Sequence, residues 1–167
     1  MLNRISALAA GTKAPAFTAR GAIAGKVFTL SLANALKKGP VVLYFYPKAF
    51  TQGCTLEAHA FAEATGDFNK AGATVIGMSN DDLPTLQRFS TEACRDKFAV
   101  ASATPAIVKA YDVGLMKDGK STGYTKRTSY VIGQDGRIKL VHSDMDYKDH
   151  VRMTLDAVRA MKGKRKA

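Results

Sequence analysis

The sequence predicts an α/β fold in which helices cover both faces of a mixed central β-sheet. Short runs of β-branched and aromatic residues alternate with longer segments whose apolar residues recur at helical spacing. Two further runs near the C-terminus flank Asp135–Gly136, a pair typical of a β-hairpin, which adds antiparallel strands. The chain has 167 residues, of which 46% are hydrophobic. We therefore expect one domain over residues 1–167, with residues 1–10 and 163–167 loosely ordered.

The N-terminal segment is expected to be extended. Residues 12–39 contain short apolar runs around a glycine-containing turn, followed by a short helix that Ser31 caps and Gly39 ends. Next comes VVLYFY at residues 41–46, a continuous apolar run that predicts a strand buried on both faces. Pro47 ends this strand.

The middle of the chain predicts a second buried strand between two helices. The first helix follows the turn after Pro47 and ends near Gly72. ATVIGMS at residues 73–79 is the strand, and Asp82 caps the second helix, which extends through Cys94. The residues expected to face the core are Leu56, Ala60, Phe61, Ala64 and Phe68 on the first helix and Leu83, Leu86, Phe89 and Ala93 on the second.

The C-terminal third predicts a short helix that ends at Gly114, an irregular stretch, two strands around Asp135–Gly136, and a last helix over about residues 147–162. Val151, Leu155, Val158 and Met161 share one face of that last helix. The order β-α-β-α, hairpin, helix is typical of a thioredoxin-like fold.

Net charge and the length of the apolar runs argue against a nucleic-acid-binding, membrane or secreted protein. The formal charge is +11, from 25 basic and 14 acidic residues, which suggests acidic partners. However, part of the excess lies in the tail KGKRKA and the rest is scattered, so we expect no specific nucleic acid. No apolar run is long enough to span a bilayer, so no membrane is expected. The first residues hold too short an apolar patch for a secretory signal, so we expect a cytoplasmic protein, with export left open.

The histidines and glycines predict neither a metal site nor a bound cofactor. His59, His142 and His150 have no ligand-like spacing with the cysteines. No glycine-rich phosphate loop is present. Two cysteines also cannot form the framework of a disulfide-rich secreted protein, although one redox-active pair is compatible with the cytosol.

Cys54 is the candidate for chemistry, because it lies in the first turn of an expected helix after a buried strand. The free N–H groups and the positive end of the helix dipole there favour an anion, and the thiolate is the reactive form of cysteine. Thr51 is placed to cap the helix or to donate to the sulfur or a substrate. Gly53 leaves room for another group, and Glu57 could orient an arginine. A cysteine here could also be a small buried apolar residue, and the residues so far leave that open.

Four motifs carry a resemblance over about residues 11–160. PKAFTQGC matches the P-x-x-x-T-x-x-C motif of peroxiredoxins, and VVLYFYPKAFTQGCTLEA resembles the bacterioferritin-comigratory-protein (BCP/PrxQ) branch of this AhpC/TSA-like family. GTKAPAFTA and KRTSYVIGQDGRI are similar to two other segments of that branch, in the same order.

The resemblance implies a thioredoxin-dependent peroxidase that reduces hydrogen peroxide and organic hydroperoxides. Cys54 would be the peroxidatic nucleophile, and Thr51 its hydroxyl partner. Arg127 would hold the thiolate and the peroxide, and Pro47 would shield the sulfur. Such a site fits the chemistry, because attack on an O–O bond needs a thiolate, and donors must stabilise the departing oxygen. The product on Cys54 is a sulfenic acid.

The sequence departs from the pattern of the branch at two positions. Gln52 replaces a usual proline, and His59 stands where many members carry a resolving cysteine. A subset of the branch places that cysteine in the following helix, which implies that Cys94 resolves the sulfenic acid as an intramolecular disulfide with Cys54. Thioredoxin or glutaredoxin would then reduce the disulfide, and we expect a monomer.

Other readings remain open at this point. Cys94 could be a buried bystander in a one-Cys peroxidase that uses an external thiol. A thioredoxin-like disulfide oxidoreductase would need C-x-x-C, but position 57 is Glu57. A basic module that binds nucleic acid or an acidic protein without catalysis is the remaining alternative.

Overall fold

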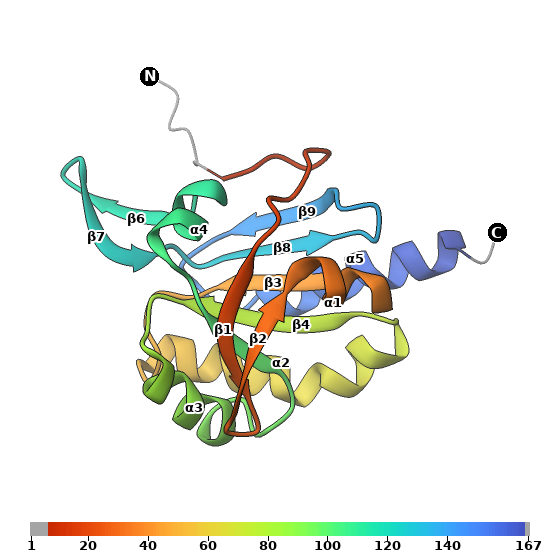
Figure 1. Cartoon of the computed structure of the whole chain (residues 1–167). Coiled ribbons are helices and arrows are strands. Elements are labelled where there is room, and N and C mark those ends of the chain that lie inside the picture. The colour runs from red at the N-terminus through yellow and green to blue at the C-terminus, as the bar shows by residue number, and fades with distance from the viewer. Residues whose placement is uncertain (1–6, 166–167) are drawn as a thin grey trace.

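A seven-stranded mixed β-sheet forms the centre of the computed structural model, which describes the backbone of residues 7–165 and the side chains of residues 7–162 (Figure 1). β4 runs parallel to β3 and β5, whereas the remaining pairs of neighbours in this sheet are antiparallel. The mixed sheet is therefore confirmed. In order across the sheet, the strands are β2 (Lys26–Ser31), β1 (Thr18–Ile23), β5 (Ala99–Ser102), β4 (Thr74–Ser79), β3 (Val41–Phe45), β8 (Thr128–Ile132) and β9 (Ile138–Ser143).

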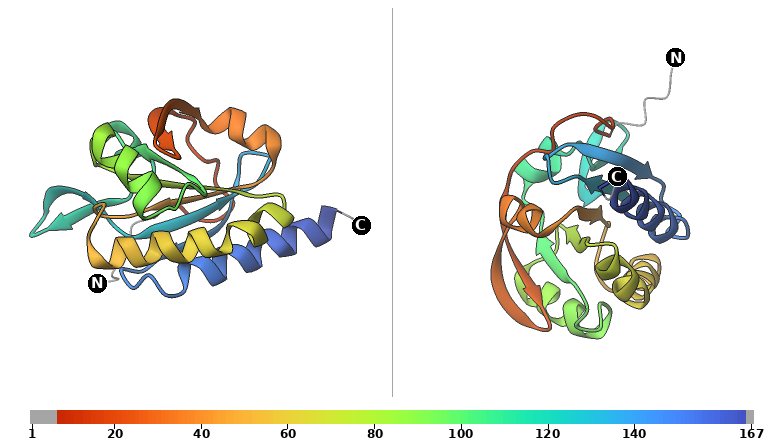
Figure 2. Two further views of the ribbon diagram at one scale, coloured as in Figure 1. Left: turned by 90° about the horizontal axis from the view of Figure 1, so that it is seen from below. Right: turned by 90° about the vertical axis from the view of Figure 1, so that its right-hand side faces the viewer.

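Helices cover both faces of this sheet, as expected. One face carries the short helices α1 (Leu32–Lys38) and α4 (Pro105–Ala110). The other face carries α2 (Gln52–Lys70), α3 (Leu83–Glu92) and α5 (His150–Arg165). α2 and α5 lie side by side along that face (Figure 2).

The central strand β3 explains why the sheet has two apolar cores. All five of its residues are buried, because β4 and β8 pair with its two edges and helices cover its two faces. Successive side chains alternate between the faces. Val42 and Tyr44 join the cluster under α2, α3 and α5, whereas Val41, Leu43 and Phe45 join the cluster under α1 and α4.

Several helix ends form where the sequence predicts them. Ser31 caps α1 by accepting a hydrogen bond from the N–H of Asn34. Asp82 caps α3 in the same way, with Thr85 as the donor. Gly39 is required after α1, since a Cβ at this position would collide with the carbonyl oxygen of Gly72, just after α2.

Three strands lie where the sequence analysis expected none. β5 is a short run of small residues between α3 and α4, and β6 (Gly114–Lys117) pairs with β7 (Lys120–Thr125) in a separate hairpin. The hairpin turns at Asp118 and Gly119, both at positive φ, which is the conformation that a two-residue turn needs. The short helix consequently ends at Ala110, before Gly114.

Two expectations for the helices are also wrong. Leu56 is 39% exposed, because the buried face of α2 passes through Cys54 and Glu57 instead. Cys94 is not in α3, since that helix ends at Glu92 and Cys94 lies in the turn that follows.

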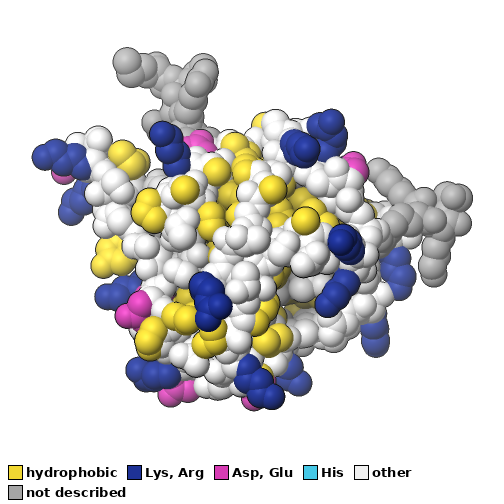
Figure 3. Space-filling model, viewed as in Figure 1, with side chains coloured by type: hydrophobic (Ala, Val, Ile, Leu, Met, Phe, Trp, Pro, Cys, Tyr) yellow, Lys and Arg dark blue, Asp and Glu magenta, His cyan; other side chains and the backbone are white. Residues whose placement is uncertain are grey.

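Only part of each terminal segment is described, since residues 1–6 and 166–167 lie outside the described residues. The N–H of Leu8 donates to the hydroxyl of Tyr130, 3.1 Å away, and α5 continues to Arg165. Lysines and arginines are spread over the face seen in Figure 3 and do not form a single stripe. Within residues 7–165, no helix is long and apolar enough to cross a membrane.

Candidate active site

The loop between β3 and α2 is tied to the end of β4. The backbone N–H of Ala49 donates to the Oδ2 atom of Asp81 at 2.7 Å, and the Ser79 hydroxyl donates to the same oxygen at 2.6 Å. Pro47, at the start of this loop, is half-buried. The hydroxyl of Thr125, at the end of β7, donates to the Tyr46 carbonyl at 2.9 Å. These contacts fix the position at which α2 begins.

Cys54 lies in the first turn of α2, as the sequence predicts. Its side chain is 1% exposed and joins the apolar cluster beneath the helix. Thr51 occupies the N-cap position but makes no side-chain cap. Its hydroxyl instead donates to the Lys48 carbonyl at 2.8 Å, so of the two roles considered for Thr51, the helix cap does not form. The N–H groups in the first turn therefore do not bond to the Thr51 hydroxyl, and the N-terminal end of α2 still favours a negative charge.

Arg127 directly precedes β8, the strand that pairs with β3, and its side chain meets Cys54. It lies between β7 and β8, is 5% exposed, and places its Nη2 atom 3.5 Å from the Cys54 sulfur. Its Nε donates to the carbonyl oxygen of Met145 at 2.7 Å, which fixes the plane of the guanidinium. Burial lowers the pKa of Arg127, but Glu57 and Cys54 outweigh that effect and the net pKa is raised. A permanent positive charge thus lies beside the sulfur.

Glu57 holds the second arm of this guanidinium. It lies one helical turn after Cys54, is fully buried, and accepts a hydrogen bond from Nη1 of Arg127 at 2.7 Å. Burial raises the pKa of Glu57 to about 8, although the charge of Arg127 acts in the opposite direction. Glu57 therefore lies where it can orient an arginine, the position that its place in the helix suggested.

His150 is a buried neighbour that the sequence analysis did not include in the site. Its Nδ1 lies 3.7 Å from Oε2 of Glu57 and 2.8 Å from the Ser129 hydroxyl. Its Nε2 lies 2.8 Å from the carbonyl oxygen of Asp144, so this nitrogen carries the proton and Nδ1 accepts. The ring of His142 is 4.5 Å away. Burial is the main cause that lowers the pKa of His150 to about 4. The hydrogen bond to the Asp144 carbonyl opposes it, and the charges of His142 and Arg127 add smaller contributions to the lowering.

This lowered pKa gives a prediction for stability. The unfolded chain binds a proton at His150 near pH 6.5, but the folded chain does so only near pH 4. The neutral ring therefore favours folding above pH 6.5. Up to about 3 kcal/mol of the free energy of unfolding is lost as the pH falls from 6.5 to 4. His150→Gln should flatten the decline in urea midpoint between pH 6.5 and 4. His59→Gln, on a half-buried part of α2, is the control that should retain it, and equal profiles for all three proteins would contradict the assignment.

Gly53 provides a second prediction, because a Cβ there would lie 3.0 Å from Nη2 of Arg127. Gly53→Ala should push the guanidinium away from Cys54 and slow the reactions of that thiol as a nucleophile about tenfold. Gly66→Ala is the control in the same helix, since a Cβ at Gly66 meets no atom within 4 Å. It should stabilise α2 by up to about 1 kcal/mol and leave the rate unchanged. Equal rates in both variants would refute this role of Gly53.

Cys94 is fully buried and is not bonded to Cys54, since both cysteines are free. Burial raises the pKa of Cys94, so its thiol stays protonated in this conformation. Both cysteines belong to the same apolar cluster. Arg95 and Asp96, directly after Cys94, have positive φ, so the turn holds a conformation that costs free energy.

The described residues contain no group of three or more histidine, cysteine, aspartate or glutamate side chains that could hold a metal ion. The buried groups linked to Cys54 through Arg127 and Glu57 include one cation, one carboxyl group and one neutral imidazole. This set can hold a thiolate and stabilise negative charge that develops on a departing oxygen.

Comparisons with known proteins agree with this chemistry. Residues 10–141 match the model of the AhpC/TSA family. The chain is 31% identical to the chloroplastic peroxiredoxin Q of Suaeda salsa over 94% of this chain and 71% of the relative. The crystal structure of peroxidoxin BcpB from Mycobacterium tuberculosis superimposes with a TM-score of 0.81 at 29% identity, covering 91% of this chain and 97% of the other. The Xanthomonas campestris bacterioferritin comigratory protein, whose structure was studied for its alkyl peroxide reduction activity, gives a TM-score of 0.75 at 27% identity, covering 86% and 91%.

Proposed function

Because the chain belongs to the AhpC/TSA family and is a peroxiredoxin of the BCP/PrxQ type, we propose that Cys54 is the residue that attacks the peroxide. The protein is a thiol-dependent peroxidase, with a peroxide as its substrate and a thiol as its reductant. The observation that carries the assignment of Cys54 is its sulfur at a helix N-terminus, 3.5 Å from the buried guanidinium of Arg127.

The proposed first step transfers one oxygen atom. The Cys54 thiolate attacks the nearer oxygen of ROOH, the O–O bond breaks, and a sulfenic acid forms while RO⁻ leaves and takes a proton as ROH. Arg127 stabilises the thiolate before attack and the leaving oxygen during it. We assign Thr51 to the peroxide as a donor, after its hydroxyl turns away from the Lys48 carbonyl. Pro47 shields the sulfur from water.

Access to Cys54 requires a local opening, because the side chain is only 1% exposed. The hinge we propose is the first turn of α2 with its preceding loop, where Gln52 replaces the usual proline of the branch. Small peroxides need the least opening. We include organic hydroperoxides among the substrates, in line with the activity named for the Xanthomonas campestris protein.

We assign Cys94 to the resolving step. Its thiol would condense with the sulfenic acid of Cys54 to give a disulfide and water, and a dithiol such as that of thioredoxin or glutaredoxin would then reduce the disulfide. Disulfide formation needs Cα atoms roughly 4.4–6.8 Å apart. The first turn of α2 and the strained turn at Arg95 and Asp96 are the two places where the chain can open to achieve this. We further propose a monomer that acts in the cytoplasm as one domain.

Two cysteine variants test this assignment. Cys54→Ser should abolish peroxide consumption, whereas Cys94→Ser should still consume the first equivalent of peroxide at the wild-type rate. Cys94→Ser should then lose thioredoxin-dependent turnover and the intramolecular bridge that mass mapping detects in the wild type. Undiminished turnover of Cys94→Ser would show that an external thiol resolves Cys54 directly.

A further inference from the structure

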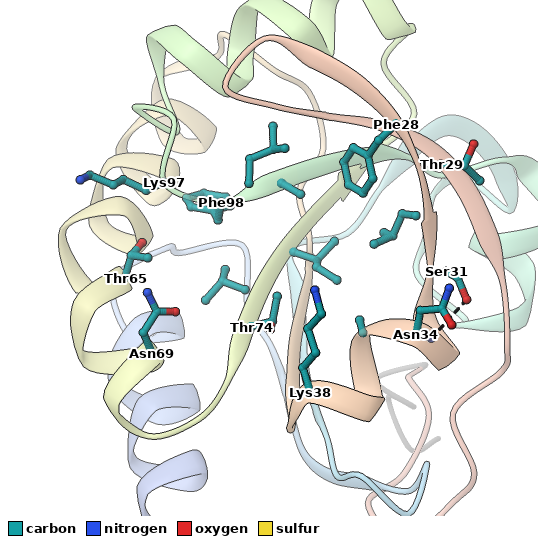
Figure 4. A pocket seen from close by; sticks show the side chains of 16 residues that line it. Phe28, Thr29, Ser31, Asn34, Lys38, Thr65, Asn69, Thr74, Lys97 and Phe98 are labelled. Atoms are coloured by element: carbon teal, nitrogen blue, oxygen red, sulfur yellow. Dashed lines mark hydrogen bonds between the residues drawn. The ribbon is translucent and has the colours of Figure 1, made fainter.

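A cavity of about 310 Å³ lies away from Cys54, where the sheet opens beside its edge hairpin (Figure 4). β1 pairs with β2 over six residue pairs but with β5 over only two. The β1–β2 hairpin therefore separates from β5 beyond these two pairs and leaves a gap between them. Residues of α1 close one side of this gap. The far wall includes Thr65 and Asn69 of α2. Thr65 is eleven residues beyond Cys54, or about 16 Å along the helix.

The lining of this cavity is apolar at its base and rich in donors at its rim. Phe28, Leu30, Ile76 and Phe98 supply apolar side chains. Lys38 extends from α1 toward the middle of the cavity in Figure 4, while Lys97 lies at the rim and points outward. Among the described residues, no aspartate or glutamate lines the cavity, and neither lysine forms an ion pair.

We propose that this cavity binds a small amphipathic monocarboxylate, such as a medium-chain fatty acid, with its carboxylate at Lys38 and its chain against Leu30 and Phe98. The volume is at the lower end of the usual range for ligand cavities, which suits a single short chain. A carboxylate beside the ammonium group of Lys38 complements its charge and stays in contact with water, because Lys38 is exposed. A neutral molecule of the same length leaves that charge unused.

The same cavity adjoins the turn that carries Cys94. Lys97 and Phe98 follow Cys94 closely, and the ring of Phe98 also packs 5.9 Å from that of Tyr44 and 6.3 Å from that of Phe61, on its core side. A bound chain therefore supports Phe98 and holds this turn in its folded form. This consequence rests on the resolving role proposed for Cys94, since a Cys54–Cys94 disulfide requires the turn to move. Linkage then makes the ligand bind the reduced protein more tightly than the disulfide form.

Titration with octanoate, followed by NMR of the reduced protein, tests the site. We expect saturable shifts at Leu30, Ile76 and Phe98, and about tenfold weaker binding of octanol. Lys38→Glu should weaken octanoate binding at least about tenfold. Lys37→Glu, which makes the same change of charge on a residue of α1 outside the cavity, should not. Absence of binding, equal affinity for octanol, or equal effects of the two variants would overturn the proposal.

Titration of the peroxide-treated protein tests the link to Cys94. Weaker octanoate binding in the disulfide form, together with slower disulfide formation at saturating octanoate, is the expected result. If the Cys54–Cys94 disulfide forms but affinity and rate do not change, the coupling is wrong. If no disulfide forms at all, the resolving role of Cys94 fails, and the titration of the reduced protein still decides whether the cavity binds the carboxylate.

Discussion

Arg127→Ala should slow the reaction of Cys54 with hydrogen peroxide by a factor on the order of 10²–10³, the loss typical when a donor to a developing oxyanion is removed. The Nη2 atom of Arg127 is 3.5 Å from the sulfur and belongs to a residue that is 5% exposed, so water screens this charge poorly. Arg127→Lys should lose nearly as much. One ammonium group cannot reproduce the contacts that the guanidinium makes with Cys54, Glu57 and the Met145 carbonyl.

Single-turnover stopped-flow measurement of thiol oxidation provides the check, because it isolates the first step from the reductant. Arg137→Ala is the matched control, since it removes the same charge from an exposed side chain that donates to the Gly11 carbonyl. Its rate should equal that of the wild type. An Arg127→Ala rate within about twofold of the wild-type rate would remove Arg127 from the mechanism.

Glu57→Ala should give the largest loss of stability among the variants considered, about 3–5 kcal/mol in the free energy of unfolding. Glu57 is fully buried and Arg127 nearly so, so the substitution leaves a buried guanidinium without its 2.7 Å partner. Glu57→Gln should lose much less, because the amide oxygen can still accept from Nη1. The difference between the losses of the two variants therefore measures the contribution of the hydrogen bond, and the loss that remains in Glu57→Gln measures that of the carboxylate charge.

Urea unfolding of the three proteins at about pH 9, above the pKa of about 8 to which burial raises Glu57, measures these losses with the carboxylate ionised. Glu63→Ala is the control on the same helix. Glu63 is exposed, and its ion pair with the exposed Arg95 is long, at 3.9 Å, so removing it costs little stability. It should change stability by less than about 1 kcal/mol. A loss for Glu57→Ala no larger than that for Glu63→Ala would mean that the buried pair does not hold the site together.

The sequence was sufficient to place Cys54 because its signals are local. VVLYFY is apolar on both faces of a strand, Pro47 ends that strand, and the helix must begin within a few residues. The buried strands of the sheet, the closing hairpin and the last helix are predicted by equally strong patterns of apolar residues. The family resemblance was needed for Arg127, since a lone arginine before a strand has no local signal that distinguishes it from an exposed charge.

Predictions failed where burial depends on distant segments. Helical spacing alone favoured Leu56 as a core residue, but Arg127 and His150 meet α2 on the side of Glu57, so the carboxyl is buried and Leu56 is 39% exposed. His150 likewise gains its role from α5 packing against β8, which no spacing in the sequence reveals.

The hairpin of β6 and β7 was a different kind of failure. Asp118–Gly119 carries the same turn signal as Asp135–Gly136, but the flanking residues are mostly polar, and β6 and β7 lie apart from the main sheet. The turn pair was therefore visible in the sequence, and only the weak apolar pattern beside it concealed the strands.

The most direct test is the rate at which Cys54 becomes a sulfenic acid in Cys94→Ser protein at neutral pH, with a dimedone trap and mass spectrometry to locate the label. We predict that the label appears on Cys54 orders of magnitude faster than on free cysteine under the same conditions. Labelling no faster than that of free cysteine would contradict the claim that the helix N-terminus and Arg127 hold this sulfur ready to attack a peroxide.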